Sequence, residues 1–129
     1  NGTEVFYFSK NPSVYAKSVA DFENSVDEKY GIKESAVDFL VNDIIYKQNQ
    51  ERSKRLAKGI VDKLADATGF KNRGVHGANF AVLRGSEVPA VLIELGFVSN
   101  DDEAAKLADP DNQKNMAVSV SKGIRAYLK

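Results

Sequence analysis

The stretch VPAVLIELGFVSN, residues 88–100, contains the strand around which the rest of the chain is predicted to pack. Its apolar run AVLI, residues 90–93, is short, continuous and bounded by turn-forming residues, as in a central strand buried on both faces. Glu94 follows this run directly, at the carboxyl end of the predicted strand, where open α/β sheets bind their ligands. Partial burial there would raise the pKa of Glu94 and suit it to proton transfer.

A purely structural role for Glu94 is the alternative, in which its carboxylate pairs with a basic neighbour such as Arg84. The local pattern favours neither role over the other. Beyond the strand, Ser99 or Asn100 can cap a helix that begins at Asp101, whose first turn is acidic.

Composition excludes several classes of function. With 129 residues, 43% of them hydrophobic and 28% charged, the chain suits one ordinary globular domain with a modest core. Lys+Arg and Asp+Glu balance at 18 each, so no net field favours nucleic acid or an anionic membrane. The sequence has no cysteine, no spanning apolar run, no phosphate-binding glycine loop and no Gly-x-Ser-x-Gly motif. Disulfides, thiolate metal sites, nucleotide binding and serine-hydrolase chemistry are therefore disfavoured.

The first third of the chain predicts a strand and then helices. Residues 3–9, TEVFYFS, alternate with apolar side chains on both faces, which indicates a sheet covered by helices on both sides. A helix is predicted over residues 14–29. Its expected apolar stripe is Tyr15, Val19, Phe22 and Val26. Glu23 and Asp27 lie four residues apart on one face of this helix, a spacing more often found on a solvated surface than at a cation site.

Further periodic segments continue to the C-terminus. Helical spacing appears over residues 34–46 and 48–68, as two helices or one bent helix, with Gly69 as the C-terminal cap. Residues 70–79 are predicted to form a loop and residues 80–84, FAVLR, a second strand. A last helix is predicted from Pro110, capped by Asp109, with an apolar stripe of Met116, Val120, Ile124, Tyr127 and Leu128.

Three segments carry a resemblance to a known family: RGV at 73–75, ANFAVLR at 78–84 and PAVLIELGFVSN at 89–100. They resemble the C-terminal half of the zinc-dependent N-acetylmuramoyl-L-alanine amidases, peptidoglycan hydrolases with an amidase-3-type catalytic domain. GTEVFYFS, residues 2–9, is similar to the strand that follows the family's second zinc histidine. The resemblance implies an α/β fold of the phosphorylase/hydrolase-like type, a mixed sheet flanked by helices, here lacking its N-terminal strands. It also implies that Glu94 is a catalytic acid/base residue beside the zinc.

The same resemblance implies that the zinc ligands lie elsewhere. In the family, a histidine and a glutamate come from the N-terminal half of the domain, and a second histidine precedes the strand similar to GTEVFYF. The present sequence begins at Asn1, after all three positions and without Met or a signal peptide, so residues 1–129 are expected to be one partial catalytic domain. Zinc is then expected in the complete domain and not in this chain, which would be inactive alone. The alternatives are a folded fragment that acts only as a binding or regulatory piece, and an unrelated α/β enzyme that uses Glu94.

Residues 14–48 resemble an insertion relative to simpler family members. AKSVADFENSVD, residues 16–27, is similar to a run in amidases of bacterial cell division, where an inserted helix covers the active site and an acidic side chain can bind the zinc. By this resemblance Glu23 is the candidate inhibitory metal ligand, and an activator protein would act on the insert. The alternative is a helix that simply packs on the sheet.

The remaining expectations concern single residues and partners. His76 begins HGAN, residues 76–79, which superficially imitates a His-x-Asn metal turn, but a lone histidine makes a weak zinc site, so a role at the substrate rim or in solvent is favoured. Arg84 is the candidate substrate-binding residue. The expected partner is peptidoglycan, in the periplasm or the extracellular cell wall, with neither nucleic acid nor membrane binding. An unpaired edge of the sheet is expected to recruit another chain.

Overall fold

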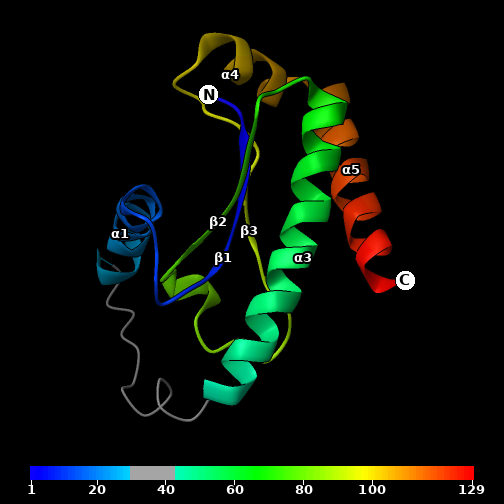
Figure 1. Ribbon diagram of the computed structural model, residues 1–129. Helices are drawn as coiled ribbons and strands as arrows, with labels where there is room; N and C mark the ends of the chain where they lie inside the picture. Colours follow the sequence, from blue (N-terminus) through cyan, green and yellow to red (C-terminus); the bar gives the residue numbers. More distant parts are fainter. Residues whose placement is uncertain (30–42) are drawn as a thin grey trace.

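The computed structural model describes residues 1–29 and 43–129 of the chain (Figure 1). The elements follow in the order β1 (Thr3–Phe8), α1 (Val14–Lys29), α3 (Asp43–Thr68), β2 (Asn72–Ala78), the 3-10 turn η1 (Ala81–Leu83), β3 (Leu92–Glu94), α4 (Asp101–Ala108) and α5 (Pro110–Leu128). Most of the helix predicted over residues 34–46 lies outside the described residues. The long helix begins at Asp43 instead of residue 48, so the end of that prediction belongs to α3.

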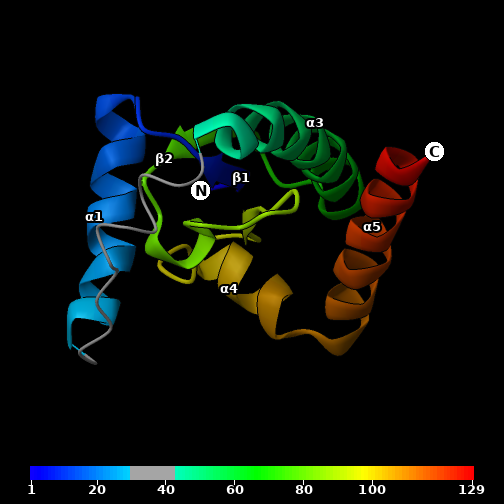
Figure 2. The same cartoon turned by 90° about the horizontal axis from the view of Figure 1, so that it is seen from below.

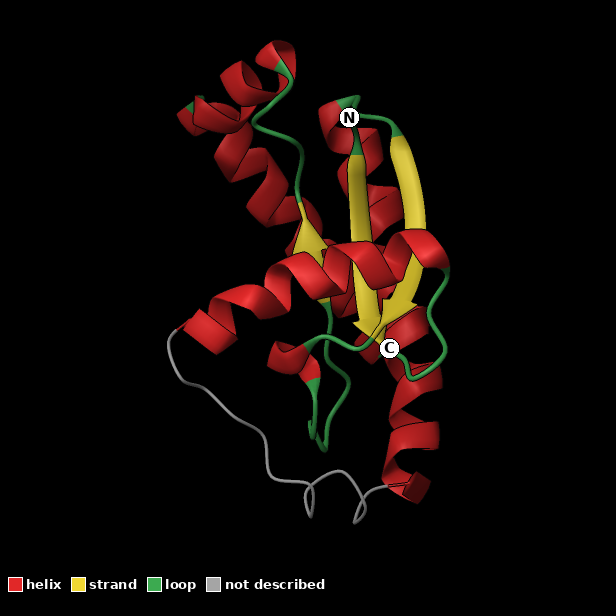
Figure 3. Ribbon diagram, turned by 90° about the vertical axis from the view of Figure 1, so that its left-hand side faces the viewer, coloured by secondary structure: helices red, strands yellow, loops and turns green. Residues whose placement is uncertain are grey.

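Three strands form a mixed sheet in the order β2-β1-β3, parallel between β1 and β2 and antiparallel between β1 and β3. Helix α1 covers one face, and α3 with α5 beside it covers the other (Figures 1 and 2). This arrangement confirms the predicted α/β class, a mixed sheet flanked by helices. The prediction of a central strand at residues 90–93 is wrong, because β1 is central and β3 has only three partly buried residues (Figure 3). The backbone N–H of Ala90 donates to Ser53 Oγ of α3, not to the ladder.

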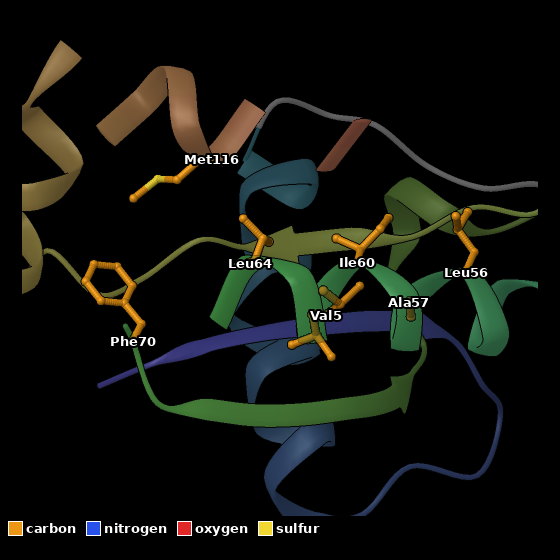
Figure 4. Close-up of a cluster of buried hydrophobic side chains, with 8 residues drawn as sticks. Val5, Leu56, Ala57, Ile60, Leu64, Phe70 and Met116 are labelled. Atoms are coloured by element: carbon orange, nitrogen blue, oxygen red, sulfur yellow. The ribbon is translucent and has the colours of Figure 1, made fainter. Parts of the chain in front are cut away.

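Strand β1 fills both cores because successive side chains point to opposite faces. Val5 is fully buried against α3, in a cluster that α5 closes through Met116 (Figure 4). Phe6 is fully buried on the other face, against Ala16 and Ala20 of α1. Full burial of side chains of this size stabilises the fold by about 1.5–3 kcal/mol each.

Helix α1 lies on the sheet through a different face from the predicted one. Its buried residues are Ala16 and Ala20, whereas Phe22 is 73% exposed. The small alanine side chains let the helix approach Phe6 closely, whereas the predicted stripe contained only large side chains. Val26 and Asp27 lie outside the residues whose side chains the structure describes.

Two predictions between α3 and β3 are also wrong. Residues 72–78 form strand β2 and not a loop, because this glycine-containing segment pairs in parallel with β1. Gly77 suits this position, since an added Cβ would lie 2.8 Å from ring atoms of Tyr7. The predicted strand FAVLR instead turns into η1, with the N–H of Leu83 donating to the carbonyl of Phe80.

The capping predictions are confirmed. Asn100 Oδ1 accepts from the backbone N–H of Glu103 at the start of α4, and Asp109 accepts from that of Asn112 at the start of α5. Gly69 ends α3 with a φ of +69°, a conformation that glycine adopts without steric cost. The α5 stripe holds only in part, since Met116 is buried and Leu128 is 74% exposed.

Two helical glycines at the crossing of α3 and α5, Gly59 and Gly123, allow a prediction that compares two matched variants. A Cβ added to Gly123 would lie 2.9 Å from Ile60 Cα, whereas one added to Gly59 would lie 3.7 Å from its nearest neighbour across the crossing, the carbonyl oxygen of Gly123. We expect Gly123→Ala to destabilise the protein by about 1–3 kcal/mol through overpacking. Gly59→Ala should be neutral or stabilising by up to about 1 kcal/mol through helix propensity. Urea unfolding of both variants measures the difference, and equal effects would contradict the packing described here.

Candidate active site

Glu94 is the last residue of β3 and lies opposite Glu4 of β1 in the antiparallel register. The carbonyl of Glu94 accepts a hydrogen bond from Thr3 Oγ1 at 2.9 Å, which holds the end of the strand against β1. Burial raises the pKa of the Glu94 carboxyl, and the charges of Glu23 and Glu4 raise it further. The predicted position at a strand end and the predicted direction of the pKa shift are both confirmed.

Glu4 is a second carboxylate of this site, which the sequence analysis did not single out. It is 1% exposed, and its Oε1 accepts from the Tyr15 hydroxyl at 2.7 Å. Its Oε2 accepts from Arg73 Nε at 3.1 Å and lies 3.8 Å from His76 Nε2. One signal was present in the sequence: a charged residue in a strand whose two faces were both expected to be covered.

Arg73 connects Glu4 to the segments around it. Its Nη2 donates to the Tyr15 hydroxyl at 3.0 Å and its Nη1 to the carbonyl of Asn1 at 3.3 Å. The guanidinium carbon lies 5.5 Å from the centre of the Tyr15 ring and 5.2 Å from that of Phe97. Hydrogen bonds to Tyr15 and then Glu4 raise the pKa of Arg73, while burial and the bond to Glu4 raise the pKa of Tyr15.

Helix α1 brings Glu23 within electrostatic reach of Glu94, and the charge of Glu23 raises the pKa of the Glu94 carboxyl. The adjacent side chain of Asn24 fixes the helix, since its Nδ2 donates to the carbonyl of Asn79 and its Oδ1 accepts from the N–H of Ala81, both at 2.8 Å. The structure therefore places Glu4 directly opposite Glu94, and the charge of Glu23 also acts on Glu94.

His76 lies on β2 and not in a metal-binding turn. Its Nε2 lies 2.8 Å from the carbonyl of Arg73, an acceptor only, so Nε2 carries the proton and donates. Its ring packs 5.7 Å from that of Phe6 and 5.6 Å from that of Tyr15. Within residues 1–29 and 43–129, no group of three or more His, Cys, Asp or Glu side chains could hold a metal ion. The zinc that the family resemblance implies therefore does not fit the described residues on their own.

Arg84 lies at the other end of β1 and does not join this cluster. Its Nε donates to Asn79 Oδ1 at 2.9 Å, and its side chain lines a pocket with Phe8 and Tyr46. Phe8 is four residues along β1 from Glu4, a distance of about 13 Å in an extended strand. The structure thus separates Arg84 from Glu94, which removes the simplest form of the alternative in which the two side chains pair.

The raised pKa of Glu94 predicts a pH-dependent effect on stability. The stability that a protonated Glu94 contributes is complete below the pKa of an unfolded glutamate, about 4.3, and is lost as the pH rises through the higher folded pKa. We therefore expect Glu94→Gln to be more stable than the wild type near pH 7.5 and to lose this advantage near pH 4. Urea unfolding at both pH values tests this, with the exposed Glu87→Gln as control. A variant less stable than the wild type near pH 7.5 would contradict the prediction.

Solved structures of amidase domains share this fold. The catalytic domain of CwlV, an N-acetylmuramoyl-L-alanine amidase from Bacillus (Paenibacillus) polymyxa, aligns with 98% of this chain and 48% of its own, with a TM-score of 0.62 and 28% identity. The CwlD amidase from Clostridioides difficile, solved in complex with the GerS lipoprotein, aligns with 98% of this chain and 46% of its own, with a TM-score of 0.63 and 24% identity. The architecture is thus that of an α/β amidase catalytic domain.

Sequence comparison assigns the family. The family model described as N-acetylmuramoyl-L-alanine amidase matches residues 1–126, and the chain belongs to this family. AmiC of Escherichia coli O6:H1, an N-acetylmuramoyl-L-alanine amidase, is 31% identical over 133 residues, which cover 99% of this chain and 32% of AmiC. The probable cell wall amidase LytH of Staphylococcus saprophyticus is 34% identical over 64% of this chain and 28% of its own length. The chain therefore spans about a third of the length of these relatives.

Proposed function

We propose that this chain is part of a peptidoglycan hydrolase that cleaves the amide between N-acetylmuramic acid and L-alanine, with Glu94 as the acid/base residue. Membership of the family supports the choice of bond. The observation that carries the role of Glu94 is its position: a partly buried carboxyl at a strand end, with a raised pKa and two further carboxylates nearby. A carboxyl group in these surroundings exchanges protons at a pH closer to neutral than an exposed glutamate does.

Glu94 would act twice in one turnover. As a carboxylate it takes a proton from the attacking water, whose oxygen bonds to the amide carbon. As a carboxylic acid it then returns a proton to the amide nitrogen as the carbon–nitrogen bond breaks. The second proton of the water stays on the new carboxyl group of N-acetylmuramic acid and passes to the amine of L-alanine or to solvent when that group ionises, and Glu94 ends the turnover as a carboxylate.

Zinc in the complete domain is part of the proposal, with its ligands contributed from outside the described residues. The test combines two measurements on this 129-residue chain and on a version that includes the N-terminal half of the domain. We expect about one zinc per chain, and release of free L-alanine amines from peptidoglycan, only from the extended version. Stoichiometric zinc on the short chain would overturn the proposed source of the ligands. An extended version that binds zinc and releases other products would overturn the proposed bond.

A folded fragment without its own activity is the second candidate function. The absence of a metal-holding group among the described residues favours it for this chain taken alone. Hydrolysis of a muropeptide by the 129-residue chain would exclude it.

Location and partners are proposed on the same basis. We propose a periplasmic or extracellular site of action at the cell wall, where the substrate lies. Among the described residues, no helix is long and apolar enough to cross a bilayer.

The outer edges of β2 and β3 have no strand partner within the described sheet, so strand pairing between copies is a further proposal. Arg84 remains a proposed substrate contact, in the pocket at the far end of β1.

Residues 14–48 are proposed to be a regulatory insert, on which an activator protein would act, with Glu23 as the inhibitory group. The support is that α1 places the charge of Glu23 close enough to raise the pKa of Glu94. We expect Glu23→Ala in the complete domain to raise basal hydrolysis several-fold. The matched control is Asp21→Ala, which removes an exposed carboxylate of α1 paired with Lys17. Equal rates for the wild type and Glu23→Ala would favour a helix that only packs on the sheet.

A further inference from the structure

The buried carboxylate of Glu4 takes no part in the proton transfers assigned to Glu94, yet it lies directly across the sheet from that residue. The register of β1 and β3 pairs Glu4 with Glu94. Directly opposite residues of an antiparallel pair share one face, with Cβ atoms about 4.5–5.5 Å apart, and like charges placed there destabilise a sheet. A charge-free residue at position 4 would avoid this repulsion, so the position of Glu4 calls for an explanation.

The contacts of Glu4 hold it as an anion in one orientation. Both of its partners are donors, the Tyr15 hydroxyl at 2.7 Å and Arg73 Nε at 3.1 Å, and each binds a different carboxylate oxygen. Removing a carboxylate from water costs several kcal/mol unless partners of this kind compensate it. The structure thus builds a satisfied negative charge into the first residues of the central strand, on the face that carries Glu94.

Arg73 extends this arrangement to the segments that border Glu94. It binds the carbonyl of Asn1, next to the start of β1, and the hydroxyl of Tyr15 on α1. Its guanidinium also lies over the ring of Phe97, three residues after Glu94. One cation therefore contacts the N-terminal segment, α1 and the loop after β3.

We propose that Glu4 and Arg73 are positioning residues for the reaction of Glu94: they hold one fixed negative charge on its face of the sheet and join the segments around it. This inference rests on the proposed function, because it takes Glu94 as the acid/base residue. A fixed neighbouring anion favours the protonated form of Glu94, the form that delivers a proton to the leaving amine. The charges that act on Glu94 are those of Glu23 from α1 and Glu4 from β1. Glu4 in turn contacts Tyr15 from α1 and Arg73 and His76 from β2, and Glu103 from α4 accepts from the N–H of Phe97, three residues after Glu94.

The test is Glu4→Gln, which keeps the size of the side chain and an acceptor oxygen but removes the charge. We expect the midpoint of the Glu94 carboxyl titration, followed by carbon NMR on this chain, to move to lower pH. In the complete domain, kcat should fall by about 10- to 100-fold, by analogy with the loss of hydrogen-bonding partners that orient metal-binding side chains, with KM unchanged. An unmoved midpoint would overturn the inference.

Glu103→Gln is the matched control. Glu103 is also buried, but its two oxygens accept from the backbone N–H groups of Gly2 and Phe97 at 2.7 and 2.9 Å. A general effect of losing a buried carboxylate would move the Glu94 midpoint equally in both variants and would overturn the proposal. If the Glu4→Gln variant does not fold, the Arg73→Lys variant is tested in its place. Arg73→Lys keeps the charges of both residues but loses the several N–H donors of the guanidinium. A fall in kcat at constant KM then supports the inference, and a wild-type kcat overturns it.

The titration does not depend on enzymatic activity, so the two proposals can fail separately. A shifted midpoint together with full activity of Glu94→Gln would remove the proposed acid/base role and leave the influence of Glu4 on Glu94 intact. An unshifted midpoint together with an inactive Glu94→Gln variant would remove the influence of Glu4 on Glu94 and leave the acid/base role of Glu94 intact.

Discussion

Replacing Glu94 by Gln in the complete domain is expected to lower the rate of amide hydrolysis by about 10²- to 10⁴-fold, the contribution typical of general acid–base catalysis. Gln occupies nearly the same volume as Glu and can still form hydrogen bonds, but it cannot take a proton from water or return one to the leaving nitrogen. The loss should appear in kcat, because proton transfer occurs only on the way through the transition state. Release of free L-alanine amines from peptidoglycan measures the rate.

Two further measurements separate this loss from a loss of folding. The raised pKa of Glu94 means that the neutral variant is expected to be at least as stable as the wild type near neutral pH. Glu87→Gln, which neutralises an exposed carboxylate in the loop before β3, should leave the rate unchanged. A folded Glu94→Gln variant that retains most of the wild-type rate would remove the acid/base assignment.

The parts of the fold that the sequence predicted are those fixed by local chemistry. Strand β1 alternates clearly, and helices α4 and α5 begin after Asn100 and Asp109, whose side chains cap them as expected. Gly69 likewise marks the end of α3. Each of these signals lies within a few residues of the feature that it predicts.

The parts that the sequence missed depend on contacts between distant segments. Strand β2 has little strand character of its own and exists because it pairs with β1. Helix α1 buries two alanines, which only the closeness of Phe6 makes significant. In the same way, the apolar run before Glu94 does not show how many strands lie beside it, and β3 pairs only with β1 among the described strands.

The same distinction between local signals and contacts of distant segments applies to the candidate site. Glu94 could be found from its place after an apolar run, and Glu23 from a resemblance. The partners of Glu4 could not be found, because Arg73 is 69 residues away in the chain and meets it only through the register of two parallel strands. The proposed reacting group and one charge that acts on it were therefore predictable from the sequence, but the ion pair of Glu4 and Arg73 was not.

Removing Arg73 is expected to destabilise the protein by about 3 kcal/mol, since it leaves the carboxylate of Glu4 buried without its cation. The measurement is the free energy of unfolding in urea for Arg73→Met. The exposed pair of Lys58 and Asp62 on α3 provides the control, and Lys58→Met should cost less than about 1 kcal/mol because water screens that pair.

A double variant identifies the cause of the loss. If the cost of Arg73→Met comes from the uncompensated charge and not from lost packing on Phe97 and Tyr15, then Glu4→Leu introduced together with Arg73→Met should restore most of the stability. Apolar replacement of a buried ion pair is often neutral or stabilising, and the introduced leucine would share a face of β1 with Phe6, at the edge of an apolar cluster. A double variant as unstable as Arg73→Met alone would show that Arg73 acts mainly through packing. The recovered double variant should still be a poor catalyst, because the charge that faces Glu94 is then gone. An apolar pair can replace the ion pair of Glu4 and Arg73 in stabilising the fold, but it cannot replace the ion pair in the proposed positioning role.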